Sequence, residues 1–159
     1  IRGLSVEDLC HSLQVNCVAA FGVIQAALPL LQPSDGLKPL AVNMGSVHAT
    51  LTKPEFVAYA ASKAALEGLT RALAVELGVD LRVCAISPAA IETDMLRSGF
   101  EYDDCSIAKL RSYHPSGSIG ATEELADMIE FLLTKGLPFA NGAIWNLDGG
   151  IRWRLHDPS

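Results

Sequence analysis

The sequence predicts an α/β fold in which about three parallel strands lie between flanking helices. Three short apolar runs, at residues 40–44, 81–86 and 143–147, alternate with longer segments that have the spacing of helices. Such alternation is typical of βαβ units, whose strands pair in parallel and are covered by helices. The middle run is apolar apart from Arg82, as expected for a strand that is buried on both faces.

Length and composition favour a single soluble domain that spans residues 1–159. Half of the 159 residues are hydrophobic, which is enough for one core. The 12 basic and 18 acidic residues give a net charge of −6. This balance argues against a nucleic-acid surface, because such a surface needs clustered Lys and Arg. The sequence has no basic segment followed by an apolar one, so no signal peptide is visible in it.

Three further observations argue against other classes of protein. The longest apolar run, residues 15–31, is interrupted by Asn16, Gln25 and Pro29, so we expect no membrane span. The cysteines have no Cys-x-x-Cys spacing, and we interpret them as reduced packing residues of a cytoplasmic protein. They are Cys10, Cys17, Cys84 and Cys105. The four histidines are scattered along the chain, so we expect no metal site.

The first predicted helix covers residues 5–27. Ser5 is a suitable N-cap, Asp8 stands near the capping-box position, and Pro29 follows the helix end. Apolar residues inside the segment recur every three to five positions. Asn16 lies within this helix, and its local pattern alone indicates an amide on the helix surface.

The first strand runs into a turn that ends at Ser46, and a loop separates it from the next helix. His48 and Thr50 in this loop either contact a substrate or only solvate the loop. The next helix is predicted over residues 56–77, which are rich in Ala, Leu and Glu and contain no Pro. Gly78 then stands in the position of a C-cap.

Tyr59 and Lys63 stand four residues apart on this helix and therefore on the same face. A cation held beside a phenol favours the phenolate form. A phenol in that setting can exchange a proton with an alcohol or a carbonyl near neutral pH. The spacing alone is a weak signal, because a Lys four residues after a Tyr also occurs by chance.

The second strand ends before Pro88, so its end and Ser46 share the carboxyl edge of the sheet, where open α/β sheets bind ligands. Residues 94–120 are the least regular part of the sequence. We interpret them as a substrate lid, and a plain surface excursion is equally consistent with the pattern. A helix over residues 122–135 follows, with Thr122 as its N-cap.

In this order, the motifs resemble those of the short-chain dehydrogenase/reductase family, from about residue 5 to residue 150. The matching set consists of Asn16, Ser46, Tyr59, Lys63, the Pro88 loop and Asp148-Gly149-Gly150. The resemblance implies reversible hydride transfer between NAD or NADP and a small-molecule carbonyl or secondary alcohol.

The resemblance also implies roles for individual residues. Tyr59 would be the general acid or base, Lys63 would assist it and hold the cofactor ribose, and Ser46 would bind the substrate oxygen. Asn16 would hold a water that connects Lys63 to solvent, which implies a local distortion of the first helix. The residues that match the family's cofactor contacts are Tyr59, Lys63, Pro88, Ala89, Ile91 and Thr93. The family usually has Gly where this chain has Ala89.

The glycine-rich fingerprint that receives the cofactor diphosphate is missing, because no two of the 13 glycines are spaced as Gly-x-Gly. We therefore expect the C-terminal portion of a longer enzyme, with the second half of a Rossmann-like doubly wound parallel sheet. We expect little turnover from these 159 residues alone. The alternative is a truncated, non-catalytic fragment that acts as a binding or interaction module. The resemblance also implies a homodimer or homotetramer, in which helices 5–27 and 56–77 pair with their copies.

Overall fold

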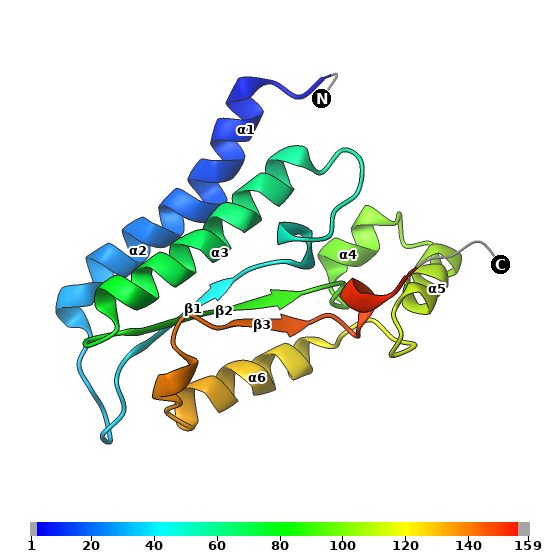
Figure 1. Ribbon diagram of the computed structural model, residues 1–159. Helices are drawn as coiled ribbons and strands as arrows, with labels where there is room; N and C mark the ends of the chain where they lie inside the picture. The colour runs from blue at the N-terminus through cyan, green and yellow to red at the C-terminus, as the bar shows by residue number, and fades with distance from the viewer. Residues whose placement is uncertain (1–2, 156–159) are drawn as a thin grey trace.

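The computed structural model describes residues 3–155 and contains a sheet of three parallel strands. The strands, in their order across the sheet, are β1 (Leu40–Met44), β2 (Arg82–Pro88) and β3 (Ile144–Leu147). The helices that cover one face are α1 (Val6–Leu13), α2 (Ala19–Ala27) and α3 (Val57–Leu77), and the helix on the other face is α6 (Thr122–Thr134) (Figure 1). The predicted α/β class is therefore confirmed, and every strand end lies within two residues of its expected position.

The first helix begins as its sequence predicts. The Ser5 hydroxyl accepts a hydrogen bond from the Asp8 backbone N–H at 3.0 Å, and the Asp8 carboxylate accepts one from the Ser5 N–H at 3.0 Å. The helix does not stay α-helical throughout, because a π-helical turn, Gln14–Val18, separates α1 from α2. A π turn inside an α-helix frequently marks a functional site, and this one contains Asn16.

The expectation that no apolar stretch reaches the length of a membrane span is wrong. The helical stretch Val6–Leu30 has 25 residues and a mean hydropathy of 1.6 in its most apolar window, so it meets the length and composition of a span. Neither Asn16 nor Gln25 interrupts it, and Pro29 lies in its last, 3₁₀-helical turn. Core helices of soluble proteins pass the same test, so the result by itself does not place the helix in a membrane.

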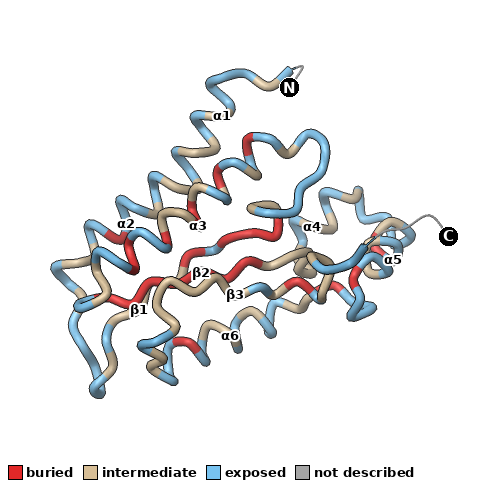
Figure 2. The backbone as a smooth tube through the Cα atoms, in the orientation of Figure 1, coloured by how far each residue is buried: buried red, intermediate tan, exposed pale blue. Residues whose placement is uncertain are grey.

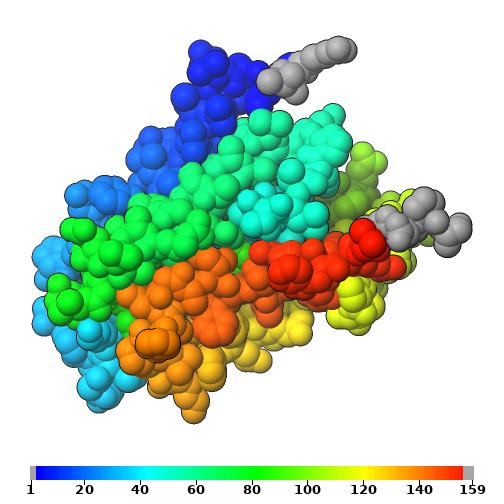
Figure 3. All heavy atoms as spheres, viewed as in Figure 1, coloured from blue at the N-terminus to red at the C-terminus, as the bar shows by residue number. Residues whose placement is uncertain are grey.

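Helix α3 lies along the sheet and is the longest continuous α-helix among residues 3–155. It buries Leu66, Thr70 and Leu73. Gly78 follows its end as predicted, but with a φ of −58° that needs no glycine. Crowding explains the residue instead, because a Cβ on Gly78 would lie 2.7 Å from the Ala74 carbonyl oxygen. In the space-filling view, this helix and the two before it form a continuous layer above β3 (Figure 3).

The centre of the core is strand β2, whose residues from Arg82 to Ser87 are all buried (Figure 2). On the face covered by α3, the buried cluster contains Ile24, Leu73, Ala74, Leu81 and Val83. On the face covered by α6, Cys84 and Ile86 pack with Leu132. The strand is therefore enclosed on both sides, which explains its nearly continuous apolar sequence.

The segment predicted to be least regular contains two helices, α4 (Asp94–Gly99) and α5 (Asp104–Tyr113). The sequence signals were the caps: the Thr93 hydroxyl accepts from the Leu96 N–H, and the Asp103 carboxylate accepts from two N–H groups of α5. Each cap joins residues that are close together in the sequence. The two helices were not predicted, because the segment has few apolar residues at helical spacing.

Two smaller expectations also differ from the structure. The N-cap of α6 is Ala121 rather than Thr122, and its N–H donates to the Glu124 carboxylate at 2.7 Å. All four cysteines are free thiols, but only Cys84 is buried, while Cys10 and Cys105 are exposed. The interpretation of the cysteines as packing residues therefore holds only for Cys84.

Candidate active site

Three of the four predicted catalytic residues, Ser46, Tyr59 and Lys63, lie just after the carboxyl end of β1 or in the first turns of α3. Lys63 lies one turn after Tyr59, and its Nζ is 5.7 Å from the centre of the Tyr59 ring. The same Nζ donates a hydrogen bond of 2.8 Å to the carbonyl oxygen of Met44, the last residue of β1. Burial lowers the pKa of the Lys63 ammonium from its usual value. Lys63 is thus fixed between the tyrosine and the strand end.

Ser46 and Tyr59 are connected through His48. The buried Ser46 hydroxyl accepts a hydrogen bond of 3.2 Å from the His48 backbone N–H, which leaves the hydroxyl hydrogen free to be donated elsewhere. The His48 ring meets the Tyr59 ring edge-on, with 5.9 Å between centroids. Burial, followed by the charge of Lys53, lowers the pKa of the His48 imidazole. The loop residue His48 therefore lies at the predicted site.

The Tyr59 ring is also supported from the loop side. Its edge-on contact with Phe56 has a centroid distance of 5.9 Å, and Phe56 in turn lies 4.6 Å from the His48 ring. The Lys53 Nζ lies 4.3 Å from the centre of the Phe56 ring. Tyr59 keeps 37% of its surface exposed. It is therefore held by neighbouring rings and still accessible to a ligand.

Asn16 reaches the same helix from the π turn. Its Nδ2 donates to the Ser62 hydroxyl at 3.0 Å, and that hydroxyl donates to the Tyr59 carbonyl oxygen at 2.8 Å. The predicted distortion of the first helix at Asn16 is confirmed. Its amide binds the helix behind Tyr59, so the described contacts connect Asn16 to Tyr59 through Ser62. Sequence reasoning missed Ser62, which is completely buried.

The predicted cofactor loop begins where β2 ends. Pro88 is the last residue of β2, and the Ala89 N–H donates to the carbonyl oxygen of Leu147 at 3.1 Å. Ile91 forms a parallel bridge with Gly120. Ala89 is not among the residues with positive φ, so an alanine fits there without strain. The Thr93 hydroxyl accepts a bond from α4 and keeps its own hydrogen to donate.

An ionic cluster holds this loop to the two helices that follow it. Glu92 pairs with Arg97 of α4 and, at 2.8 Å, with Arg111 of α5. The hydrogen bond from Arg111 is the largest cause that holds the pKa of Glu92 below its usual range, and Arg97 adds to it. The cluster links the loop that contains Glu92 with α4 and α5. No local sequence pattern predicts the pairing of Glu92 with Arg111.

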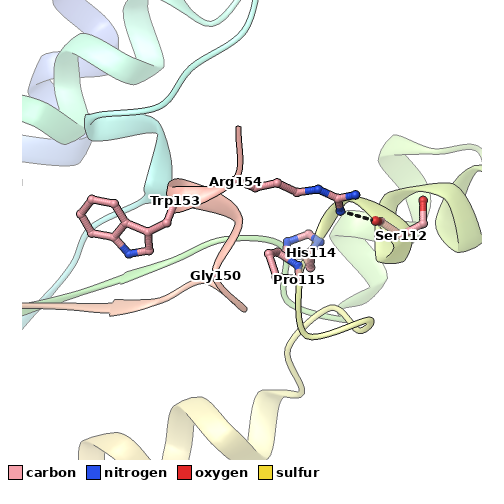
Figure 4. Close-up of a pocket in the computed structure, with 6 residues that line it drawn as sticks. All are labelled: Ser112, His114, Pro115, Gly150, Trp153 and Arg154. Atoms are coloured by element: carbon pink, nitrogen blue, oxygen red, sulfur yellow. Dashed lines mark hydrogen bonds between the residues drawn. The ribbon is translucent and has the colours of Figure 1, made fainter. Parts of the chain in front are cut away.

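A separate pocket of about 660 Å³ lies between the end of α5 and the segment after β3 (Figure 4). The residues that line it are Ser112, His114, Pro115, Gly150, Trp153 and Arg154. None of the predicted catalytic residues lines this pocket. Within residues 3–155, no group of three or more His, Cys, Asp or Glu side chains is placed to hold a metal ion.

The chain is similar to known proteins over most of its length. A family model described as enoyl-(acyl carrier protein) reductase matches residues 1–152. A short-chain dehydrogenase/reductase of a Cladobotryum species is 32% identical to the chain and matches 92% of it and 59% of its own length. The chain spans between 54% and 59% of the first three curated relatives.

Solved structures show the same fold. The ligand-free aldohexose dehydrogenase of Thermoplasma acidophilum has a TM-score of 0.89 and 28% identity, covering 100% of this chain and 66% of that one. The RhlG protein of Pseudomonas aeruginosa, solved as an active-site complex with NADP, has a TM-score of 0.84 and 30% identity. That match covers 94% of this chain and 59% of the RhlG chain.

Proposed function

Because this chain belongs to the short-chain dehydrogenase/reductase family, we propose that the protein transfers hydride reversibly between a nicotinamide cofactor and a carbonyl or secondary alcohol. The observation that carries the proposal is the convergence of Tyr59, Lys63 and Ser46 at one strand end. His48 contacts both the serine hydroxyl and the tyrosine ring. The Cladobotryum relative is a dehydrogenase/reductase and the Thermoplasma structure is a dehydrogenase, and neither supports an interaction module.

In the proposed reaction, Tyr59 gives its phenolic proton to the carbonyl oxygen during reduction and takes it back during oxidation. The Lys63 ammonium, whose Nζ lies 5.7 Å from the centre of the Tyr59 ring, would assist this transfer. Ser46 donates its free hydroxyl hydrogen to the oxygen as negative charge develops there. Asn16, through Ser62, holds the backbone of Tyr59 in place. The helices of residues 94–120 would then form the substrate lid.

The residues at the strand ends fit a nicotinamide cofactor, which supplies the hydride when it is bound. Lys63 has three donor hydrogens and uses one on Met44, so two remain for ribose hydroxyls. Thr93 can donate to a phosphate oxygen, and the backbone at Pro88, Ala89 and Ile91 lies along the same edge of the sheet. Either NAD or NADP is compatible with these contacts.

The proposal is tested by titrating the complete protein with NADH and with NADPH, followed by assays of carbonyl reduction. We expect one of the two cofactors to bind and to be oxidised by a small carbonyl compound. Lys63→Met should weaken cofactor binding at least tenfold, because a charged hydrogen bond contributes about 1.5–3 kcal/mol. Binding of neither cofactor, together with no turnover, would contradict the proposed function.

We also propose that the protein is a homodimer or a homotetramer. The layer formed by α1, the π turn, α2 and α3 leaves several apolar side chains exposed: Val15, Val18, Phe21, Val23 and Val57. A second copy would cover these side chains in a symmetric interface, as the family resemblance implies. Light scattering at tens of micromolar protein should give at least twice the monomer mass. A monomer at that concentration, or protein recovered only with membranes, would contradict this assembly.

A further inference from the structure

A buried carboxyl–hydroxyl pair lies directly beneath the proposed site. Glu67 follows Tyr59 and Lys63 at the same spacing of four residues, so all three stand on one face of α3. Glu67 is 6% exposed, and Ser87 at the end of β2 is fully buried. The Ser87 hydroxyl donates to Oε1 of Glu67 at 2.6 Å. This distance is typical of a hydroxyl bound to a carboxylate.

Ser87 also packs against the backbone that leads into Ser46. A Cβ on Gly45 would overlap the Ser87 hydroxyl oxygen, so only glycine allows this close approach. The Gly45 N–H donates to the carbonyl oxygen of Ile86 at 2.7 Å. The turn before Ser46 is thus held from below by β2 and by the Ser87 side chain.

The face of α3 that carries Tyr59 is therefore tied to both neighbouring strands. Lys63 binds the carbonyl of Met44 at the end of β1, and Glu67 binds Ser87 at the end of β2. Apolar side chains could fill the space between helix and strand, but their contacts are not directional. A hydrogen bond fixes both the depth and the rotation of the helix on the sheet.

We infer that Glu67 and Ser87 are positioning residues that hold α3 and the Gly45–Ser46 turn in the relative placement required for Ser46 and Tyr59 to act on one oxygen atom. The inference depends on the proposed function for its catalytic consequence, but its structural part can be measured separately. Neither residue contacts the proposed substrate, and both act through the serine and the tyrosine.

The chain offers a matched control pair in the same layer. Nδ2 of Asn43 donates to the Thr70 hydroxyl at 2.9 Å, and both residues are buried. This bond also joins α3 to a strand, one turn further along the helix. Its strand partner Asn43 is the second-last residue of β1 and lies before the Gly45–Ser46 turn rather than in it. Breaking it with Thr70→Val therefore removes a comparable buried contact without releasing that turn.

The first measurement is amide hydrogen exchange of the complete protein, which needs no activity. In Ser87→Ala, exchange of the Gly45 and His48 amides should rise about tenfold relative to other amides of β1, the ratio expected for loss of one hydrogen bond. Glu67→Gln keeps an acceptor but a weaker one, so it should raise the same two rates by a smaller factor. In Thr70→Val, the exchange rates of both amides, taken relative to the other amides of β1, should stay within about twofold of the wild-type ratios.

The second measurement separates kcat from the KM for cofactor. Ser87→Ala should lower kcat at least tenfold with KM for cofactor nearly unchanged, and Thr70→Val should change neither beyond its effect on the folded fraction. The inference is overturned if Ser87→Ala raises the exchange rates of the Gly45 and His48 amides no more than Thr70→Val does. If Ser87→Ala does not fold, Glu67→Gln takes its place in this comparison. A wild-type protein without turnover would count against the proposed function, and the exchange rates would still decide the positioning role.

Discussion

Replacing Tyr59 by Phe is expected to lower turnover by about 10²–10⁴-fold, the usual contribution of a positioned general acid or base. The substitution removes only the phenolic oxygen and its proton. The edge-on contacts of the ring with His48 and Phe56 can remain, and Lys63 keeps its bond to Met44. Cofactor affinity should therefore change much less than kcat, and the folded structure should be retained.

The matched control for this prediction is Tyr102→Phe. Tyr102 lies between α4 and α5, is 61% exposed and is not among the residues that meet at the strand ends. Tyr102→Phe also removes a phenolic oxygen, but one outside the proposed site, so kcat should stay within about twofold of wild type. Steady-state carbonyl reduction by the complete protein measures both variants. If Tyr59→Phe retained activity within about tenfold of wild type, Tyr59 would not be the proton donor.

The features that the sequence predicted well are those set by local chemistry. The apolar run before Ser46 and the run that contains Arg82 became the two central elements of the site, because buried parallel strands need continuous apolar residues. The spacing of Tyr59 and Lys63 guaranteed a common helix face. The Ser5 capping box fixed the start of the first helix, since both of its hydrogen bonds join neighbouring residues.

The features that were missed depend on residues far apart in the chain. Asn16 and Ser62 are 46 positions apart and Glu67 and Ser87 are 20 apart, so no local pattern pairs them. Arg82 shows the same limit: it interrupts an apolar strand, yet it is buried because its guanidinium donates to the carbonyl oxygens of Lys38 and Leu132. A polar residue in a buried strand indicates that a partner exists without identifying it.

The largest expected effect on stability belongs to another such residue, Asn141. Its Oδ1 accepts from the buried N–H of Val83 at 2.7 Å, and its Nδ2 donates to the carbonyl oxygen of Ala74 at 2.8 Å. One side chain thus joins the start of β2 to the last turns of α3. Asn141→Ala leaves a buried donor and a buried acceptor without partners, at a cost of about 1–3 kcal/mol each.

We therefore expect Asn141→Ala to lower the free energy of unfolding by about 2–6 kcal/mol, a large share of the total for a domain of this size. Urea denaturation of the complete protein measures the loss. Asn146→Ala is the control, because Asn146 is an exposed asparagine of β3 whose substitution should cost no more than about 0.5 kcal/mol. Since the two variants delete the same amide, their difference isolates the bridge between β2 and α3. A loss below about 1 kcal/mol for Asn141→Ala would mean that Val83 and Ala74 find other partners, and that the bridge does not stabilise the fold.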